Sequence, residues 1–304
     1  MPNQFRTTRV RLAWLLLFIA PALWSANMLV ARWSSPWFPP HALAFWRWTI
    51  ALVPMLAICG VVLWRRRDEV RREWKDLLVL GALGMWVCGA FVYIGGATTT
   101  ATNIGLLYAG VPVLVMLLSA AVFHERLGVA QVIGAGIALL GVLAIIARGE
   151  TRTLLGLQFT VGDIWAFVAA TCWAIYTVLM RFRPSRLDPF LRLTAVTIAG
   201  VLVLAPLTLA EALLVGLPPL EWRSLAAALI VGLLPGFGAY QAYSWLLREV
   251  GATRTSLVLY LTPVYTALLS WLLLGEAMHG YHYAGAVMVL GGVWLASRGA
   301  AGRV

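Results

Sequence analysis

The sequence predicts an all-α integral membrane protein: ten transmembrane helices that form two inverted five-helix repeats, with both termini in the cytoplasm. Three observations predict this class, namely the apolar composition, the placement of the basic residues and an internal repeat. Apolar residues make up 62% of the 304 residues and charged residues only 12%, whereas soluble proteins have roughly 45–50% and 25%. This composition excludes a soluble globular domain.

Apolar stretches long enough to cross a bilayer follow one another along the chain. About 20 apolar residues span roughly 30 Å of hydrocarbon, and glycine, proline and charged residues separate such stretches here. The first stretch follows Arg6, Arg9 and Arg11, but it is longer than the apolar core of a signal peptide, so we expect it to be retained. The predicted spans are residues 12–31, 42–63, 77–97, 102–122, 131–147, 163–182, 189–211, 224–247, 254–274 and 281–297.

The basic residues indicate the orientation of these spans. If the N-terminus lies in the cytoplasm, 17 of the 23 Lys and Arg residues fall on that side, many of them in the loop RRRDEVRREWK at 65–75, and four fall outside. Because cytoplasmic loops carry the excess of positive charge, we expect a multi-pass protein of the bacterial inner membrane with both termini inside. The net charge of +11 is then a topology signal, and no nucleic-acid partner is expected.

An internal repeat relates the two halves of the chain. When residues 101–142 are aligned with 252–293, 14 of the 42 positions are identical, including a proline and a glutamate that apolar bias cannot explain. Because each unit has five helices, an odd number, the second unit must enter the membrane upside down. Inverted repeats of this kind recur in secondary transporters. The predicted repeats are residues 1–148 and 149–304.

Glycines recur at helical spacing inside the spans. In membranes, small residues allow two helices to approach closely. The string GAGIALLG at 134–141 lacks the GxGxxG spacing of a dinucleotide-binding loop, so packing is the expected role. Close helix contacts are therefore predicted at Gly134, Gly141, Gly232, Gly236, Gly285 and Gly292.

Three stretches resemble a known family. ATNIGLLYAGVPVLVMLLSAAVFHER at 101–126 and ATRTSLVLYLTPVYTALLSWLLLGE at 252–276 are similar to a motif of the EamA-type permeases in the drug/metabolite transporter superfamily, and FWRW at 45–48 resembles the pattern of that family's second helix. The resemblance implies a central cavity lined chiefly by helices 1–4 and 6–9, and export of amino acids or related metabolites. It also implies a proline midway along helices 4 and 9 and a glutamate ending each, here Pro112, Pro263, Glu125 and Glu276.

Aromatic and polar residues well inside the spans are candidates for the substrate cavity. Interfacial belts explain aromatic residues near span ends but not those in mid-span, and ligand pockets combine aromatic walls with a few placed polar groups. Ordinary helix packing is the alternative for each of them individually. As a group they indicate an uncharged-to-zwitterionic, moderately apolar small-molecule substrate. The candidates are Trp24, Asn27, Arg47, Trp86, Tyr93, Trp173, Tyr176, Tyr240, Gln241, Tyr243 and Tyr260.

The ionisable and proline candidates each have a functional and a structural interpretation. Pro112 and Pro263 either act as hinges for a rocking motion or fix kinks that shape the bundle. Glu125 and Glu276 lie at span ends, where capping or anchoring a loop is favoured over carrying protons. Arg47 lies about six residues inside its span; it either attracts a substrate carboxylate or, as we favour here, snorkels or ties down a neighbouring helix.

Several motifs and residue types that the sequence lacks restrict the possible transport mechanisms. There is no P-loop, so no nucleotide cofactor is expected. No Asp or Glu falls in mid-span, which leaves proton coupling without an obvious carrier and favours uniport or exchange. His279 and His282 share a loop on the side opposite His124, so these three cannot form one metal site.

These observations together predict a secondary transporter that exports amino acids or similar small metabolites by alternating access, with membrane lipids as its other partners. A drug exporter or an uptake permease of the same fold stays open, as do the coupling ion and the oligomeric state. An intramembrane enzyme would need a nucleophile with its base, or a metal set, and no HExxH, GxSxG or paired mid-span carboxylate occurs. A membrane sensor would have little use for a duplicated inverted unit. No enzymatic activity is therefore expected.

Overall fold

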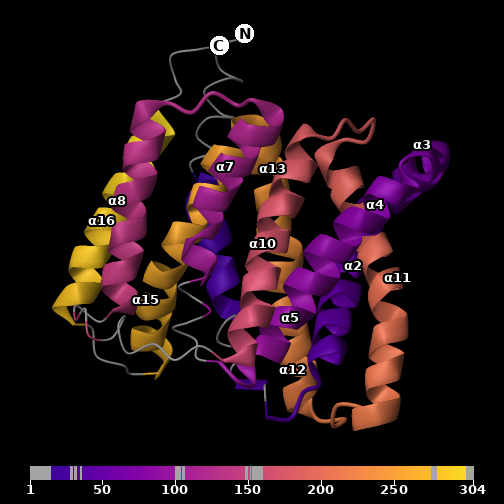
Figure 1. Ribbon diagram of the computed structural model, residues 1–304. Coiled ribbons are helices and arrows are strands. Elements are labelled where there is room, and N and C mark those ends of the chain that lie inside the picture. Colours follow the sequence, from indigo (N-terminus) through magenta and orange to yellow (C-terminus); the bar gives the residue numbers. More distant parts are fainter. Residues whose placement is uncertain are drawn as a thin grey trace.

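The computed structural model describes residues 15–27, 30, 33–34, 36–99, 104, 107–147, 150, 152, 160–274 and 279–298. These residues form helices joined by turns, without a strand among them (Figure 1), and helix is present in each of the ten ranges predicted as spans. The helices of the first half are Leu15–Asn27, α2 (Pro40–Arg65), α3 (Arg67–Arg72), α4 (Trp74–Gly81), α5 (Cys88–Gly96), α7 (Val111–Phe123) and α8 (Val129–Ile146). Those of the second half are α10 (Val161–Phe182), α11 (Pro189–Val215), α12 (Trp222–Val231), α13 (Tyr240–Val250), α14 (Ala252–Ser256), α15 (Thr262–Leu274) and α16 (Gly280–Arg298).

Several helical segments are suited to a bilayer. Five are long and apolar enough to cross one: Pro40–Arg65, Trp74–Gly96, Val161–Phe182, Pro189–Val215 and Trp222–Val250. Shorter apolar helices lie at Leu15–Asn27, Leu107–Phe123 and Val129–Ile145. The described residues are thus all-helical apart from turns and connecting segments, which is consistent with a multi-pass membrane protein. Ten membrane crossings and two cytoplasmic termini stay predictions.

Two of the long helical segments contain a π-helical stretch at matched positions of the repeat. The segment η1 (Ala82–Val87) lies between α4 and α5, and η2 (Gly232–Ala239) lies between α12 and α13; both are π-helical. Their first residues are 150 positions apart, close to the offset between residues 101 and 252. π-Helical insertions frequently occur at functional sites, and both segments here border the same buried centre.

Pro112 and Pro263 lie near the middle of their predicted spans, but each begins a new helical segment instead of bending a continuous helix. Pro112 lies in the first turn of α7, after a turn at Gly110. Pro263 lies in the first turn of α15, after the 3₁₀ segment η3 (Leu257–Leu261). A proline in the first turn removes no helical hydrogen bond, because the N–H there has no partner within the helix. One helix in each half is thus interrupted at the matched position.

Most helices surround one apolar centre. α2 runs beside α11, and α10 packs against α5, while η2 approaches α2 closely through its glycines. A Cβ built on Gly232 would lie 2.6 Å from Ile50 Cγ2, and one built on Gly236 would lie 3.2 Å from Ala51 Cβ. α8 and α16 form a separate pair at the left of Figure 1, with α7 and α15 between this pair and the other helices.

The α8–α16 pair is held together at its glycines. A Cβ built on Gly134 would lie 2.4 Å from the backbone nitrogen of Ala296, and one built on Gly292 would lie 2.5 Å from the Gly134 carbonyl oxygen. Further along, a Cβ on Gly141 would lie 2.8 Å from the Gly285 carbonyl oxygen. Real Cβ atoms do not approach backbone this closely, so only glycine fits these positions. The predicted close contact between these helices is confirmed.

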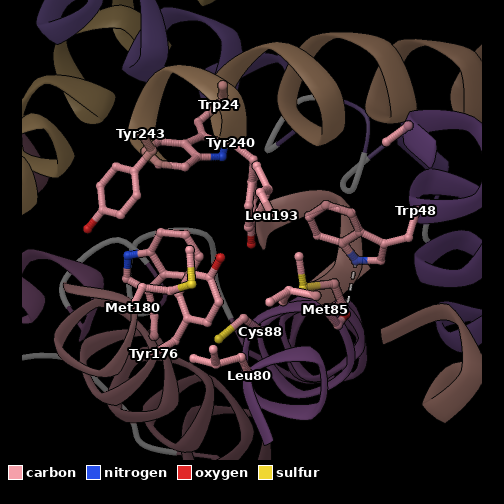
Figure 2. Packing of buried hydrophobic residues seen from close by; sticks show 14 of the residues in the cluster. Trp24, Trp48, Leu80, Met85, Cys88, Tyr176, Met180, Leu193, Tyr240 and Tyr243 are labelled. Carbon is pink, nitrogen blue, oxygen red and sulfur yellow. Dashed lines mark hydrogen bonds between the residues drawn. The ribbon is translucent and has the colours of Figure 1, made fainter. Parts of the chain in front are cut away.

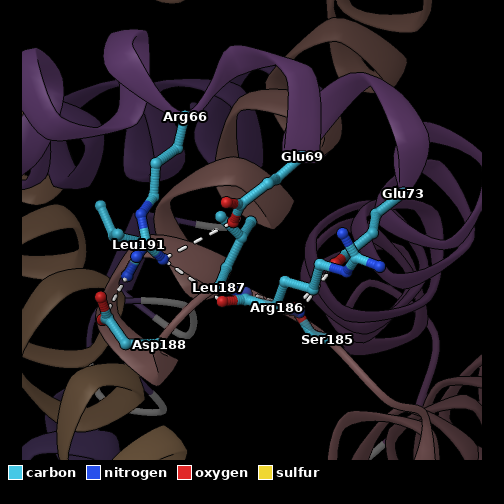
Figure 3. Close-up of polar contacts among 8 residues, drawn as sticks. All are labelled: Arg66, Glu69, Glu73, Ser185, Arg186, Leu187, Asp188 and Leu191. Carbon is cyan, nitrogen blue, oxygen red and sulfur yellow. Dashed lines mark hydrogen bonds and ion pairs between the residues drawn. The ribbon is translucent and has the colours of Figure 1, made fainter.

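Polar contacts link α2 to α11 at one end, and the segment after α2 to the loop before α11 at the other. At one end, the Glu211 carboxylate of α11 accepts hydrogen bonds from the backbone N–H groups of His41 at 3.1 Å and Ala42 at 2.8 Å, and so caps the start of α2. At the other end, the Glu73 carboxylate accepts hydrogen bonds from Ser185 Oγ at 2.7 Å and from the Arg186 N–H at 2.9 Å (Figure 3). The loop before α11 is therefore fixed against the segment that follows α2.

Candidate functional site

Six aromatic side chains from four helices meet in the buried centre, and we call this group the aromatic cluster. The Trp24 ring centroid lies 5.5 Å from that of Trp173, 5.8 Å from that of Tyr240 and 5.1 Å from that of Tyr243. The Trp48 ring meets the Tyr240 ring edge-on at 4.6 Å. Aromatic pairs at these separations and angles attract one another beyond the burial of their area. The cluster comprises Trp24, Trp48, Trp173, Tyr176, Tyr240 and Tyr243, most of them labelled in Figure 2.

Helical spacing and one glycine bring these rings together. Trp173 and Tyr176 are three residues apart on α10 and stack at 5.2 Å, and Tyr240 and Tyr243 have the same spacing on α13. Gly84 of η1 lets the backbone approach, since a Cβ there would lie 2.7 Å from the Tyr176 ring. The Gly84 carbonyl oxygen accepts a hydrogen bond from the Tyr240 hydroxyl at 3.1 Å. The π-helical segment thus supplies an acceptor to the cluster.

Arg47 lies against the cluster and is only 4% exposed. Its guanidinium carbon lies 4.8 Å from the Trp48 ring centroid and 5.6 Å from that of Tyr240, which is cation–π geometry. Its Nη1 donates a long hydrogen bond to the Tyr93 hydroxyl at 3.5 Å. Among the described residues, Nε has no hydrogen-bond partner and no carboxylate forms an ion pair with the guanidinium. Arg47 is therefore not placed at a surface, and no carboxylate of the described residues balances its charge.

Two tyrosine hydrogen bonds occupy matched positions in the two halves. The Tyr93 hydroxyl donates to Asn27 Oδ1 at 2.7 Å, and the Tyr243 hydroxyl bonds Thr177 Oγ1 at 2.9 Å. In both pairs the partners are 66 residues apart in sequence. Each bond joins the first helix of a repeat to the third, so the same polar link recurs on both sides of the centre.

Three candidates lie away from the aromatic cluster. Trp86 is half-buried and packs edge-on against Phe91 at 5.7 Å. Gln241 follows Tyr240 in sequence but lines a different space, a cavity of about 510 Å³ between α13 and the start of α11. Tyr260 is fully buried in a second apolar cluster beside α8 and α16. The structure thus brings together eight of the eleven candidates and leaves these three outside.

Two acidic residues near helix ends accept hydrogen bonds from threonines in other segments of the chain. Glu125 Oε2 accepts a hydrogen bond from Thr253 Oγ1 at 3.0 Å, which links the end of α7 to α14. Asp163 is buried in the first turn of α10 and accepts a hydrogen bond from Thr99 Oγ1. The Glu125 contact has the form that an anchoring role requires, although the role itself stays a prediction. Glu276 lies outside the described residues.

Sequence reasoning missed two residues that the structure brings into view. Trp48 was contained in the quoted FWRW motif, yet its contact with Tyr240 depends on helix rotation, which the motif does not reveal. Arg192 is 7% exposed and is the counterpart of Arg47, because F-x-R-x-T occurs at both 45–49 and 190–194. This shorter repeat is a signal that could have found it. Since α2 and α11 run in opposite directions, the two arginines lie toward opposite ends of the bundle.

The rings of the cluster fill the centre in this conformation. Within the described residues, the cluster side chains are at most 8% exposed, so the implied central cavity is closed here. The described residues also contain no group of three His, Cys, Asp or Glu side chains arranged for a metal ion. What the centre offers chemically is aromatic surface, several hydroxyl and amide groups and one uncompensated positive charge.

Comparison with known proteins decides the family. A model of the EamA-like transporter family matches residues 11–147 and again residues 160–298. The chain belongs to this family. The expected EamA-type permease of the drug/metabolite transporter superfamily is thereby confirmed, and with it a membrane transporter built from two copies of one family unit.

Relatives of the EamA-like chain cover almost its whole length. It is 28% identical over 278 residues to the "Uncharacterized transporter YyaM" of Bacillus subtilis (strain 168), covering 90% of this chain and 89% of the relative. It is 25% identical over 296 residues to the "Probable terminal-alkyne amino-acid exporter" of Streptantibioticus cattleyicolor, covering 94% and 96%. A solved crystal structure with 24% identity superposes with a TM-score of 0.75 over 93% of this chain and 96% of that one. That likeness supports the fold.

Proposed function

We propose that this EamA-like protein exports amino acids or similar small carboxylate-bearing metabolites across the bacterial inner membrane. It acts as a secondary transporter by alternating access, through uniport or exchange. Two inverted repeats, residues 1–148 and 149–304, provide ten membrane crossings with both termini in the cytoplasm. The halves rock about the breaks that precede Pro112 and Pro263. The relative named as an amino-acid exporter supports this cargo class.

The observation that carries the proposal is Arg47 among the aromatic rings. A guanidinium that is 4% exposed and has no carboxylate partner among the described residues is costly in a membrane protein. A substrate carboxylate would neutralise it through charge-assisted hydrogen bonds, which are about twice as strong as neutral ones. The rings beside it would take up an apolar or aromatic side chain of the same substrate.

The alternatives within this fold are a drug exporter and a metabolite uptake permease. A lipophilic cation would be repelled by Arg47, because like charges in a low-dielectric site interact strongly. This charge disfavours the cationic drugs that many exporters remove. Uptake would use the same residues, so only the direction of net flux separates it from export.

The decisive experiment is counterflow in proteoliposomes preloaded with a mixture of the twenty amino acids, with and without a proton gradient. We expect tracer accumulation that does not depend on the gradient. Trp173→Ala should lower the transport rate severalfold while the protein stays folded, because it removes the ring at the middle of the cluster. Accumulation that requires the gradient would contradict uniport and exchange. No movement of any amino acid would overturn the proposed cargo class.

A further inference from the structure

A second, polar cavity of about 510 Å³ opens at the end of the bundle that is predicted to face the cytoplasm. It lies between the end of α10, the loop before α11, the start of α11 and the end of α13. We call it the arginine pocket because six arginines line it: Arg66, Arg181, Arg183, Arg186, Arg192 and Arg248.

Acidic residues neutralise only part of this charge. Arg183 forms an ion pair with Asp76. Arg66 Nη1 lies 3.6 Å from Glu69 Oε2, as drawn in Figure 3. Asp188, the acid in the lining, caps α11 by accepting hydrogen bonds from two backbone N–H groups at 3.1 Å each. Over the described part of the chain, the other four lining arginines form no ion pair with a carboxylate.

Arg192 is the buried arginine of the pocket, and one of its N–H donors has no acceptor among the described residues. It is 7% exposed, and its Nη1 donates to the Met180 carbonyl oxygen at 2.7 Å. Its Nε is buried and has no acceptor among the described residues. A buried N–H group without an acceptor costs about 1–3 kcal/mol and more when it is charged. The guanidinium is therefore bonded through Nη1, keeps a buried N–H without an acceptor among the described residues, and belongs to a side chain that lines the cavity.

We propose that the arginine pocket is a binding site for a small anion, which it takes through carboxylate or phosphate oxygens. Guanidinium groups bind both kinds of oxygen in a bidentate manner. The exposed arginines at the rim attract an anion from solution, and the buried Arg192 at the base completes its hydrogen bonds. The ligand is either a soluble anion or the headgroup of an acidic lipid, because both carry the same chemistry.

This site is separate from the centre around Arg47 and does not depend on what the protein transports. Arg47 approaches the rings Trp48 and Tyr240, whereas Arg192 donates to the Met180 carbonyl oxygen near the end of α10 and lines the arginine pocket, which Arg47 does not. The inverted repeat has thus placed one F-x-R-x-T arginine against aromatic rings and the other against a basic cavity. A test of the pocket can therefore use binding alone.

The test measures the unfolding temperature of the purified protein in a neutral detergent while citrate or inorganic phosphate is titrated at constant ionic strength. We expect saturable stabilisation. Arg192→Gln should weaken the apparent affinity roughly tenfold or more, because a charge-assisted contact is lost. Arg248→Gln, an exposed lining residue, keeps the test informative if the first variant does not fold. Arg67→Gln is the matched control: it removes an exposed charge at the same end, outside the pocket lining, and should change the affinity less than twofold.

A second arm distinguishes the two sources. The same variants are compared in nanodiscs of phosphatidylcholine and in nanodiscs that also contain phosphatidylglycerol. Stabilisation by phosphatidylglycerol that Arg192→Gln and Arg248→Gln reduce, with no response to citrate or phosphate, would assign the pocket to a lipid headgroup. A response to the soluble anions assigns it to those. No saturable response in either arm, or equal loss in Arg67→Gln, would overturn the proposal.

Discussion

The α8–α16 pair and the aromatic cluster both join the two halves of the chain, but they use repeat-matched positions differently. In the pair, Gly134 matches Gly285 and Gly141 matches Gly292 in the sequence alignment of the halves. Each of these glycines approaches the backbone of the opposite helix. The contact is therefore nearly symmetric, with the same residue type on both sides.

The centre shows the opposite pattern. Arg47 and Arg192 occupy matched positions, but Trp48, which follows Arg47, is replaced by Leu193 in the second motif. As a result, one arginine has aromatic neighbours and the other borders the arginine pocket. The glycines that bring α8 and α16 together are thus matched in the two halves, whereas the residues that follow the two matched arginines differ. We expect the pair to govern the amount of folded protein and the centre to govern transport.

The largest effect is expected in the pair. Gly141→Leu forces a side chain into a space where even a Cβ would lie 2.8 Å from the Gly285 carbonyl oxygen and 2.8 Å from Met288 Cβ. Because overpacking costs about 1–3 kcal/mol and more against backbone, we expect most of the protein to be lost as aggregate. The measurement is the monodisperse fraction in size-exclusion chromatography after extraction in detergent.

A matched control lies on the same helix. A Cβ built on Gly136 meets no atom within 4 Å, so Gly136→Leu should leave the monodisperse fraction unchanged. Equal losses in Gly136→Leu and Gly141→Leu would mean that α8 tolerates no large residue anywhere, and the glycine contacts would no longer explain the pair.

The second effect is expected in the centre. Arg47→Gln removes the positive charge that lies against the Trp48 and Tyr240 rings of the aromatic cluster, so the apparent KM for an amino-acid substrate should rise roughly ten- to hundredfold, as for loss of a charge-assisted hydrogen bond. Arg47→Lys should recover part of the affinity, because the charge returns without the planar fork. The measurement is counterflow at varied substrate concentration.

Arg223→Gln serves as the control for general surface charge, because Arg223 is exposed at the start of α12. Its KM should match that of the unaltered protein. If Arg47→Gln transported normally while folded, the arginine would be a packing residue, and the difference between the pair and the centre would lose its functional meaning.

The sequence predicted the helical regions well, because the lengths of the apolar runs and the Gly, Pro and charged residues between them locate helices in a chain of this composition. It predicted the glycine contacts for a related reason, since matched small residues in two apolar helices leave few other roles. It did not predict η1 and η2, because a π-helical segment has the same apolar composition as the α-helix around it. Within a continuous apolar run, the sequence does not reveal where the backbone changes from the α-helical to the π-helical hydrogen-bond pattern.

Helix rotation was the main obstacle at the site. Tyr240 and Gln241 are neighbours in sequence, yet one joins the aromatic cluster and the other lines a separate cavity. Tyr260 looked equivalent to the central tyrosines, but η3 turns it toward α8 and α16. In a span that is apolar all round, periodicity does not reveal which face points inward.

The smallest effect is expected on stability, when the two matched tyrosine hydrogen bonds of the centre are removed one at a time. Tyr93→Phe and Tyr243→Phe each remove one of the two matched hydrogen bonds, to Asn27 and Thr177, and Tyr93→Phe also removes the long bond from Arg47. Each should lower the free energy of unfolding by about 0.5–1.5 kcal/mol, measured by titration with sodium dodecyl sulfate in mixed micelles.

Tyr260→Phe is the control, because the Tyr260 hydroxyl is buried without a partner among the described residues. Removing that hydroxyl should leave stability unchanged or raise it, since an unpaired buried group is lost. Equal destabilisation by all three substitutions would mean that the hydroxyls act through packing, and that the matched bonds do not hold the first and third helices of each repeat together.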